Sequence, residues 1–112
     1  MYNRYHISSC KTELNKDSFL IYRYFLIESV KDIHMRNHKA SVMTYGIEAT
    51  SERLAEDRVE HVYGDKIDCI SPDKEKVLGL IELLRSHEVS PIHLIDITGA
   101  FVDEWVEDFK TY

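Results

Sequence analysis

The chain is poor in residues that interrupt or cross-link a fold, with two prolines, four glycines and two cysteines among 112 residues. So little proline and glycine excludes collagen-like and low-complexity chains. No run of eighteen apolar residues occurs, which argues against a membrane-spanning helix. The first residues, MYNRYHISSCK, lack the basic-then-apolar order of a signal peptide. We therefore expect a cytoplasmic protein with no membrane partner.

The two cysteines, Cys10 and Cys69, do not form the close pair that a redox centre or a zinc ribbon needs. In a chain without an export signal, two such residues are more often reduced thiols than a disulfide. No Walker loop, dinucleotide-binding glycine motif or GxSxG sequence occurs either. We expect no cofactor, and the commonest enzyme classes are excluded.

Basic residues are outnumbered, because 14 Lys and Arg stand against 20 Asp and Glu and give a formal charge of −6. A surface that binds nucleic acid through phosphates is cationic, so no nucleic-acid partner is expected. The charge is uneven: residues 1–40 carry seven basic and four acidic side chains (+3), and residues 41–112 carry seven and sixteen (−9). This asymmetry fits either an ordinary solvated surface or attraction between the two ends, within one chain or between copies.

What the chain does contain is enough apolar sequence for one folded domain over residues 1–112, with 44% hydrophobic residues and seven tyrosines. Residues 1–70 read mainly as β structure. Alternating residues predict a first, edge strand through Leu14, and the aromatic-rich stretch 18–30 predicts a central strand because both of its faces are apolar. Residues 31–39 look like a loop or one helical turn.

Alternation returns over residues 40–50, where Gly46 suggests a bulge or a close backbone approach. Residues 51–57 look like a polar connection that holds at most a short helical turn, and a fourth, long strand is expected over residues 58–70. In the last part, Ser71-Pro72 and Ser90-Pro91 each precede a helical apolar pattern, so each serine is predicted to cap a helix. The predicted fold is α+β: an antiparallel sheet of about four strands, followed by a two-helix unit over residues 71–112 packed on one face.

Two histidines, His34 and His38, stand four residues apart, a spacing that places both imidazoles on one face of a helix. A metal ion would need a third ligand, for which His61 is the first candidate and His6 or Cys69 the others. No HExxH sequence accompanies them. The alternative is an ordinary polar loop, so we expect no metal site.

His93 and Asp96 lie three residues apart near the start of the second helix, and Glu88 precedes them. A His–Asp pair can orient an imidazole for acid–base catalysis. No nucleophile is marked beside them, so the competing interpretation gives His93 a local structural role. These residues define the alternative function, a small metal-dependent or histidine-based hydrolase.

Phe101, Trp105 and Phe109 form an aromatic stripe on the second helix and are the candidate interaction residues. With no catalytic motif beside them, they favour a non-catalytic protein-interaction or regulatory module. Its partner is expected to be another protein or a second copy of the chain, in a homodimer.

Three blocks of sequence, YGIE at residues 45–48, DCISPDKEKV at residues 68–77 and VSPIHL at residues 89–94, occur together. In these blocks the chain resembles a family of small uncharacterised bacterial proteins, a domain of unknown function. The resemblance implies a compact cytosolic bacterial protein and carries over no catalytic residue.

Overall fold

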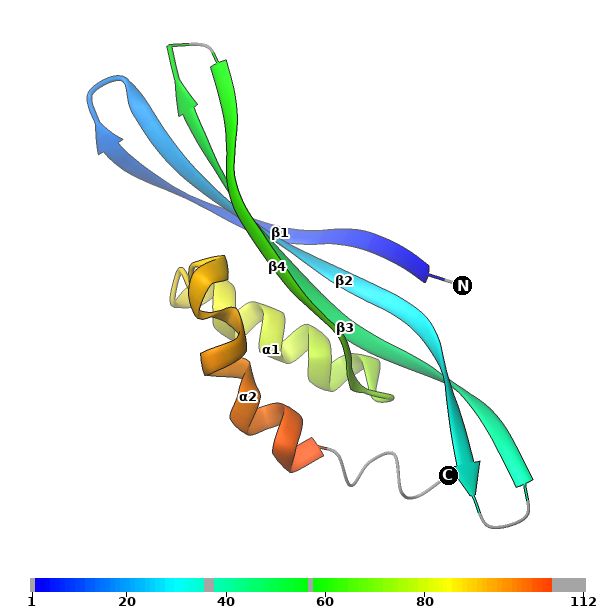
Figure 1. The fold of residues 1–112 in the computed structure, drawn as a ribbon. Coiled ribbons are helices and arrows are strands. Elements are labelled where there is room, and N and C mark those ends of the chain that lie inside the picture. The colour runs from blue at the N-terminus through cyan, green and yellow to red at the C-terminus, as the bar shows by residue number, and fades with distance from the viewer. Residues whose placement is uncertain (1, 36–37, 57, 106–112) are drawn as a thin grey trace.

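The computed structural model describes residues 2–35, 38–56 and 58–105. Its four strands are β1 (Tyr2–Asn15), β2 (Ser18–Met35), β3 (His38–Ala55) and β4 (Arg58–Ser71). They pair in the order β1-β2-β3-β4, every neighbouring pair antiparallel, as successive hairpins (Figure 1). The predicted sheet, the central position of the second strand and the edge position of the first are confirmed.

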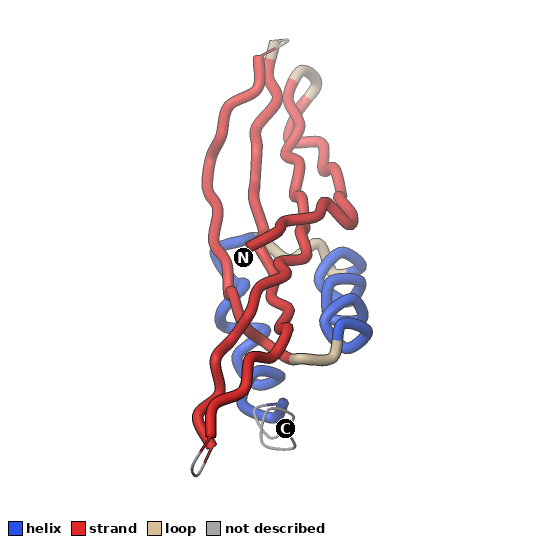
Figure 2. The backbone as a smooth tube through the Cα atoms, turned by 90° about the vertical axis from the view of Figure 1, so that its right-hand side faces the viewer, coloured by secondary structure: helices blue, strands red, loops and turns tan. Residues whose placement is uncertain are grey.

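Three elements follow the sheet: α1 (Lys74–Ser86), the short 3-10 helix η1 (Pro91–His93) and α2 (Leu94–Trp105). Figure 1 shows both α helices on one side of the sheet, and in the view of Figure 2 the strands pass in front of α2 while α1 lies beside them. The α+β fold with two C-terminal helices on one face is therefore as predicted. No helix among the described residues has the length and apolar character needed to cross a membrane.

The caps of the two helical segments agree only in part with the prediction. Ser90 caps η1, since its side chain accepts a hydrogen bond from the amide of Ile92, and Pro91 follows at the first position. At α1 the cap is Asp73, whose carboxylate accepts from the amides of Glu75 and Lys76. Ser71 is instead the last residue of β4, fully buried, and its hydroxyl accepts from the amide of Asp73. Because the strand runs on through Ser71, the first helix begins later than predicted.

The hydrophobic core lies between the helices and the middle of the sheet. Tyr24 and Leu26 of β2 are opposite Ala49 and Ile47 of β3, so these four side chains share the covered face. They pack with the buried face of α1 and with Leu94 of α2. Tyr24 is completely buried, and its hydroxyl donates to the carbonyl oxygen of Val89 at 2.7 Å. This bond ties the sheet to the connection between α1 and η1.

The opposite face of the sheet is covered by its own charged side chains. Arg4 stacks on the ring of Phe25, with its guanidinium carbon 3.6 Å from the ring centre, and pairs with Glu48. Toward the β1–β2 turn, Lys11 lies over the ring of Phe19 at 4.0 Å. Such contacts cover aromatic surface while the charges stay in water. The open face is therefore neither bare apolar surface nor a cationic patch.

Side chains from the two edge strands meet above the middle of this open face. The ammonium group of Lys66 in β4 lies 4.9 Å from the ring centre of Tyr2 in β1. Asp68, and after it Tyr2, raises the pKa of Lys66. Beneath them, Ile27 of β2 is fully buried although the helices lie on the other side. The twist of the sheet thus closes its centre on both faces.

Gly46 is the point of closest approach between β3 and β4. The register is irregular here, because Tyr45 pairs with Ser71 and Ile47 with Ile67, so two steps along β3 match four along β4. A Cβ atom on Gly46 would lie 2.0 Å from the carbonyl oxygen of Ile67 and 2.4 Å from that of Asp68. The bulge and close approach predicted at this glycine are both confirmed.

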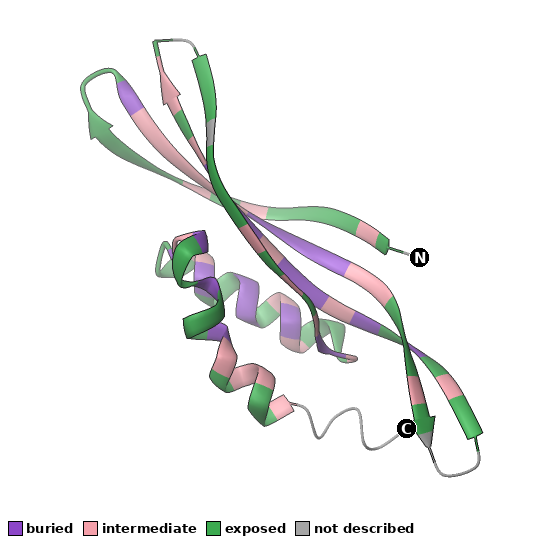
Figure 3. Ribbon diagram, in the orientation of Figure 1, coloured by how far each residue is buried: buried purple, intermediate pink, exposed green. Residues whose placement is uncertain are grey.

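The ends of the sheet reach beyond the helices, which gives the molecule extents of 61 × 25 × 19 Å. Residues 31–35 continue β2 and residues 38–39 begin β3, so the loop or helical turn predicted over residues 31–39 is wrong. The polar connection predicted over residues 51–57 is likewise part of β3 as far as Ala55. Buried residues are concentrated at the centre, and the β2–β3 end of the sheet is largely exposed (Figure 3).

Candidate functional site

The three candidate catalytic residues lie on the solvent side of the segment that leads into α2. His93 ends η1 and its amide donates to the carbonyl oxygen of Ser90 at 2.9 Å. Asp96 is in the first turn of α2, and Glu88 has a left-handed backbone conformation, with φ of 50°, just after α1. All three side chains are exposed. The buried positions of the same segment are Pro91, Leu94 and Thr98.

Of the three candidate metal ligands, His34 and His38 lie at one end of the sheet and His61 near the other. His34 is paired with Lys39, and His38 with Met35, at the β2–β3 end. The backbone of His61 pairs with Glu52 near the other end. Lys39 and Glu52 are thirteen residues apart along β3, which corresponds to about 40 Å. Among the described residues, no three His, Cys, Asp or Glu side chains are placed to hold one metal ion.

The helical spacing assumed for His34 and His38 is wrong, because both residues belong to strands. The polar contacts at this end of the sheet are a hydrogen bond and an ion pair, both made by Asp32. Asp32 accepts a hydrogen bond from Ser41 at 2.9 Å and faces Lys39 at 3.6 Å. The hydrogen bond from Ser41, and after it the charge of Lys39, lowers the pKa of Asp32. This end of the sheet carries a cross-strand ion pair.

The aromatic residues predicted for interaction are half-buried where they are described. Phe101 and Trp105 contact the core cluster, and their ring centres lie 5.4 Å apart. The ammonium group of Lys76 in α1 lies 5.6 Å from the ring centre of Trp105, which links the two helices. Phe109 is outside the described residues. Much of the aromatic surface predicted to be free is therefore packed inside the molecule.

Three isoleucines of this region are exposed instead, and the two most exposed were not singled out by the sequence reasoning. Ile92 in η1 is 63% exposed and Ile95 in α2 is 53% exposed. They flank His93 and Leu94, and a spacing of three residues puts them on one side of the helical segment. The signal was present in the sequence, since Ile95 stands off the stripe formed by Leu94, Thr98, Phe101 and Trp105.

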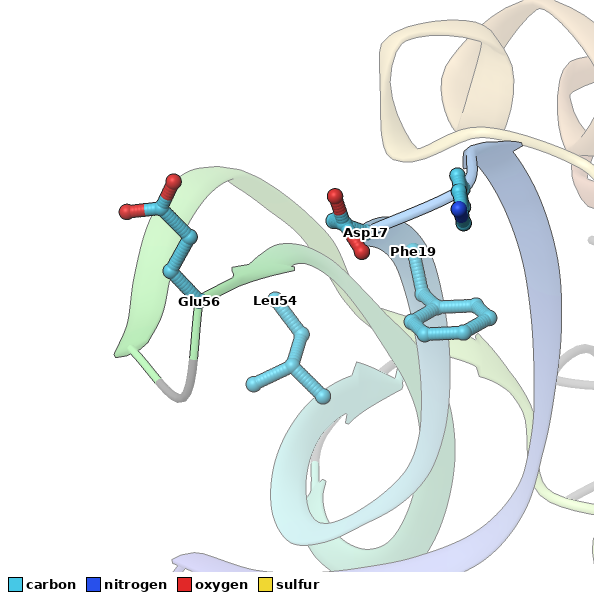
Figure 4. Close-up of a pocket in the computed structure, with 5 residues that line it drawn as sticks. Asp17, Phe19, Leu54 and Glu56 are labelled. Carbon is cyan, nitrogen blue, oxygen red and sulfur yellow. The ribbon is translucent and has the colours of Figure 1, made fainter.

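Two hollows on the surface are lined by residues from different elements. One, of about 370 Å³, lies where the β1–β2 turn meets the end of β3, and is lined by Lys16, Asp17, Phe19, Leu54 and Glu56. Figure 4 shows the side chains of Phe19 and Leu54 below the carboxylates of Asp17 and Glu56. The second, of about 420 Å³, lies between β1, β2 and α1, and is lined by Tyr5, Ile7, Leu26, Glu28, Lys74 and Leu78. Neither includes His93, Asp96 or Glu88.

The most perturbed titratable groups are structural. Burial raises the pKa of Tyr24, whose hydroxyl is bound to the carbonyl of Val89. Cys10 lies with its sulfur 3.9 Å from the same hydroxyl, and burial raises the pKa of this thiol. A raised thiol pKa disfavours the thiolate, which is the reactive form of cysteine. Both cysteines are free.

Comparison with known proteins places the chain in a family without assigning an activity. No curated protein and no solved structure matches it. A family described as a family of unknown function (DUF6514) matches residues 3–104, which include all of α1 and all but the first residue of the sheet and the last residue of α2. Because this match spans most of the chain, the protein belongs to the family of unknown function DUF6514.

Proposed function

We propose that the protein is a non-catalytic, cytoplasmic interaction module that forms a homodimer through the surface around Ile92 and Ile95. The observation that carries the proposal is the exposure of these two isoleucines, 63% and 53%, side by side at the start of α2. Single exposed apolar residues are common on monomers. Two large aliphatic side chains on one side of a rigid helical segment form a patch that association would remove from water.

The polar residues around this patch suit a symmetric contact. In a two-fold interface, residue i of one copy meets residue j of the other, and j meets i. His93 and Asp96 are both exposed beside the two isoleucines and carry complementary hydrogen-bonding groups. A two-fold axis through the patch lets His93 of each copy face Asp96 of the other around an apolar centre. This gives the sequence-predicted His93 and Asp96 a role at the rim of an interface.

The patch rests on a well-held base, which keeps the two isoleucines in place. Pro91 and Leu94 are buried beneath them, and Thr98 donates a hydrogen bond to the carbonyl of Leu94 at 2.6 Å. Side chains that are already fixed lose less conformational freedom on binding. The free thiols of Cys10 and Cys69 support a reducing, cytoplasmic location.

Light scattering coupled to size-exclusion chromatography tests the proposal. The wild-type chain of 13.2 kDa is expected at twice this mass at high micromolar concentration. The double variant Ile92→Ser/Ile95→Ser is expected at the monomer mass with an unchanged circular dichroism spectrum, because both side chains are exposed. Val59→Ser, at an equally exposed apolar position on β4, is the matched control and should remain dimeric. A monomeric wild type, or an equal loss of mass in the control, would refute the proposal.

A further inference from the structure

The groove between β1 and α1 combines an apolar floor with the free edge of a strand. Tyr5 and Ile7 of β1 are 45% and 41% exposed, and they line the groove with Leu26 and Leu78. β1 pairs with β2 along one edge, and among the described residues its other edge has no strand partner. An edge strand beside an apolar groove is an arrangement that can bind an added strand. The edge strand forms main-chain hydrogen bonds with the added strand, and the groove receives its side chains.

The length of edge available for pairing is short. The register of β1 shifts between His6, opposite Phe25, and Ser8, opposite Tyr24, so Ile7 is an extra residue in a β-bulge. A bulge disrupts the regular ladder and bends the strand. The regular stretch beside the groove is therefore Tyr2–His6. Pairing with a long edge strand of a second copy would be interrupted at the bulge. A short extended segment can pair with Tyr2–His6 without reaching the bulge.

The charge at the groove favours an acidic side chain on the occupant. Lys74, the first residue of α1, lines the groove and is exposed. In the part of the chain that the structure describes, no carboxylate is close enough to pair with its ammonium group. Glu28 also lines the groove, and its carboxylate accepts a hydrogen bond from the side-chain amide Nδ2 of Asn3 at 3.4 Å. The cation of Lys74 thus remains available at the rim.

The register of the strands shows where Lys74 lies relative to β1, and so which residue of a bound segment would meet its ammonium group. Glu28 is opposite Asn3 on one side and Tyr45 on the other, and Tyr45 is opposite Ser71, just before α1. The start of α1 therefore lies level with Asn3, and Leu78 is one turn further along the helix. Along an added strand, alternate side chains on the groove side are spaced by about 7 Å. A carboxylate near Asn3 is then followed, two residues on, by an apolar side chain near Tyr5.

We propose that Tyr2–His6 and the groove beneath it bind an extended, acidic segment of a partner protein by strand addition. The segment places an acidic residue against Lys74 and an apolar residue, two positions away, between Tyr5, Ile7 and Leu78. The proposal rests on the proposed role as an interaction module and adds a partner class to it. It uses a surface separate from Ile92 and Ile95, so the two can fail independently.

Titration of the full-length ¹⁵N-labelled protein with short capped peptides tests the inference by NMR. The probe TDTVTVT presents aspartate and two valines on one side of a strand, and TKTVTVT replaces the aspartate by lysine. Threonine at the other positions favours an extended conformation. The expected result is saturable shifts of the amides of Tyr2–His6 and of the first turns of α1 with TDTVTVT, and weaker binding of TKTVTVT. The peptide TDTVPVT lacks one backbone donor and should bind more weakly than TDTVTVT.

Charge reversal of the protein supplies the decisive comparison. Lys74→Glu should weaken the binding of TDTVTVT by about twofold to fivefold, the range expected for one exposed ion pair, and should reverse the preference between the two peptides. Ile7→Ser should weaken both, and Val59→Ser should change neither. An unchanged spectrum with TDTVTVT at about 1 mM, or a preference that Lys74→Glu leaves unaltered, overturns the inference.

Light scattering separates this result from the homodimer proposal. If Ile7→Ser lowers the mass of the protein to that of the monomer, the groove holds a second copy and the partner assigned here is wrong. If the protein has the mass of a dimer and no peptide binds, only the peptide-binding inference is refuted. Peptide binding by a monomeric protein keeps the inference and removes the dimer.

Discussion

A single methyl group added at Gly46 should destabilise the protein more than the same change at Gly79 or Gly99. The Cβ atom of alanine would lie 2.0 Å from the carbonyl oxygen of Ile67 and 2.4 Å from that of Asp68. Both neighbours are backbone atoms, which no change of rotamer can move away. To bring the shorter distance to 3.0 Å, the smallest that real Cβ atoms adopt, β4 must move by about 1 Å.

The free-energy cost of moving β4 follows from the contacts that this strand makes. Ile67 and Ile70 of β4 pack against the core, and Thr44 bridges to the end of the strand through Cys69 and Ser71. Displacing a strand in a close-packed interior typically costs 1–3 kcal/mol, occasionally more, so we expect a loss of about 3 kcal/mol in the free energy of unfolding. For a domain of this size that corresponds to a fall of about 12 °C in Tm.

Urea unfolding followed by circular dichroism measures this loss. Gly79→Ala and Gly99→Ala are matched controls, because no atom lies within 4 Å of either added Cβ and both positions are helical. These variants should gain about 0.5–1 kcal/mol from helix propensity. If Gly46→Ala is within about 0.5 kcal/mol of the wild type, the size of a neutral surface change, the close approach does not exist as described.

Three further predictions concern individual contacts. Tyr24→Phe removes the donor to the buried carbonyl of Val89, so unfolding free energy should fall by about 1–2 kcal/mol near neutral pH. Since burial raises the pKa of Tyr24 above 10.0, its phenol stays protonated in the folded state while the unfolded chain ionises. This contribution of Tyr24 to the free energy of unfolding should therefore be fully present below pH 10 and should fall above it by up to about 1.4 kcal/mol per pH unit. The slope should be smaller in Tyr24→Phe. Urea titrations at pH 9 to 11 would measure both slopes. Asp73→Ala removes the cap of α1 and should cost about 1 kcal/mol, whereas an unchanged Tm would mean that the cap lies elsewhere. Arg4→Gln loses its stacking on Phe25 and its pair with Glu48, and should cost about 1 kcal/mol in the same assay, with a smaller loss at high salt.

The elements that the sequence predicts well are those whose burial leaves a pattern. The centre of β2 was recognisable because Tyr24 and Leu26 face the helices while Phe25 and Ile27 are buried on the other side. Gly46 was recognisable because a glycine inside a strand usually has a steric reason. The apolar spacing of α1 and the cap at Ser90 likewise reflect local constraints that act on neighbouring residues.

The stretches that were missed lie toward the ends of β2 and β3, away from the hydrophobic core cluster. Residues 31–35 and 51–55 extend β2 and β3 toward or into the hairpin ends, where hydrogen bonds to the neighbouring strand hold the backbone. In residues 31–35 the described side chains are exposed or half-buried, and in residues 51–55 only Ser51 is buried, so no strict alternation of polar and apolar residues is required. The same cause explains why His34 and His38 were judged by helical spacing, although both lie in strands.

The candidate site was only partly predictable for a related reason. Whether Ile97 or Thr98 faces inward depends on how α2 is rotated against the sheet, and the apolar pattern of its sequence admits both. The structure buries Thr98 and leaves Ile97 40% exposed. The groove between β1 and α1 joins residues some seventy positions apart, so no local pattern reports it.

The hairpin topology of the sheet also has a consequence for the order in which the molecule folds. Every strand pairs with its neighbours in sequence, so each step closes a short loop and costs little chain entropy. The bond from Tyr24 to Val89 joins positions 65 residues apart and closes a far longer loop. Contacts of this range form late unless other contacts have already brought the segments together. We expect the meander to assemble first and the docking of the helices to limit the folding rate, so that substitutions at Val89 change the rate of unfolding more than those in the centre of β2.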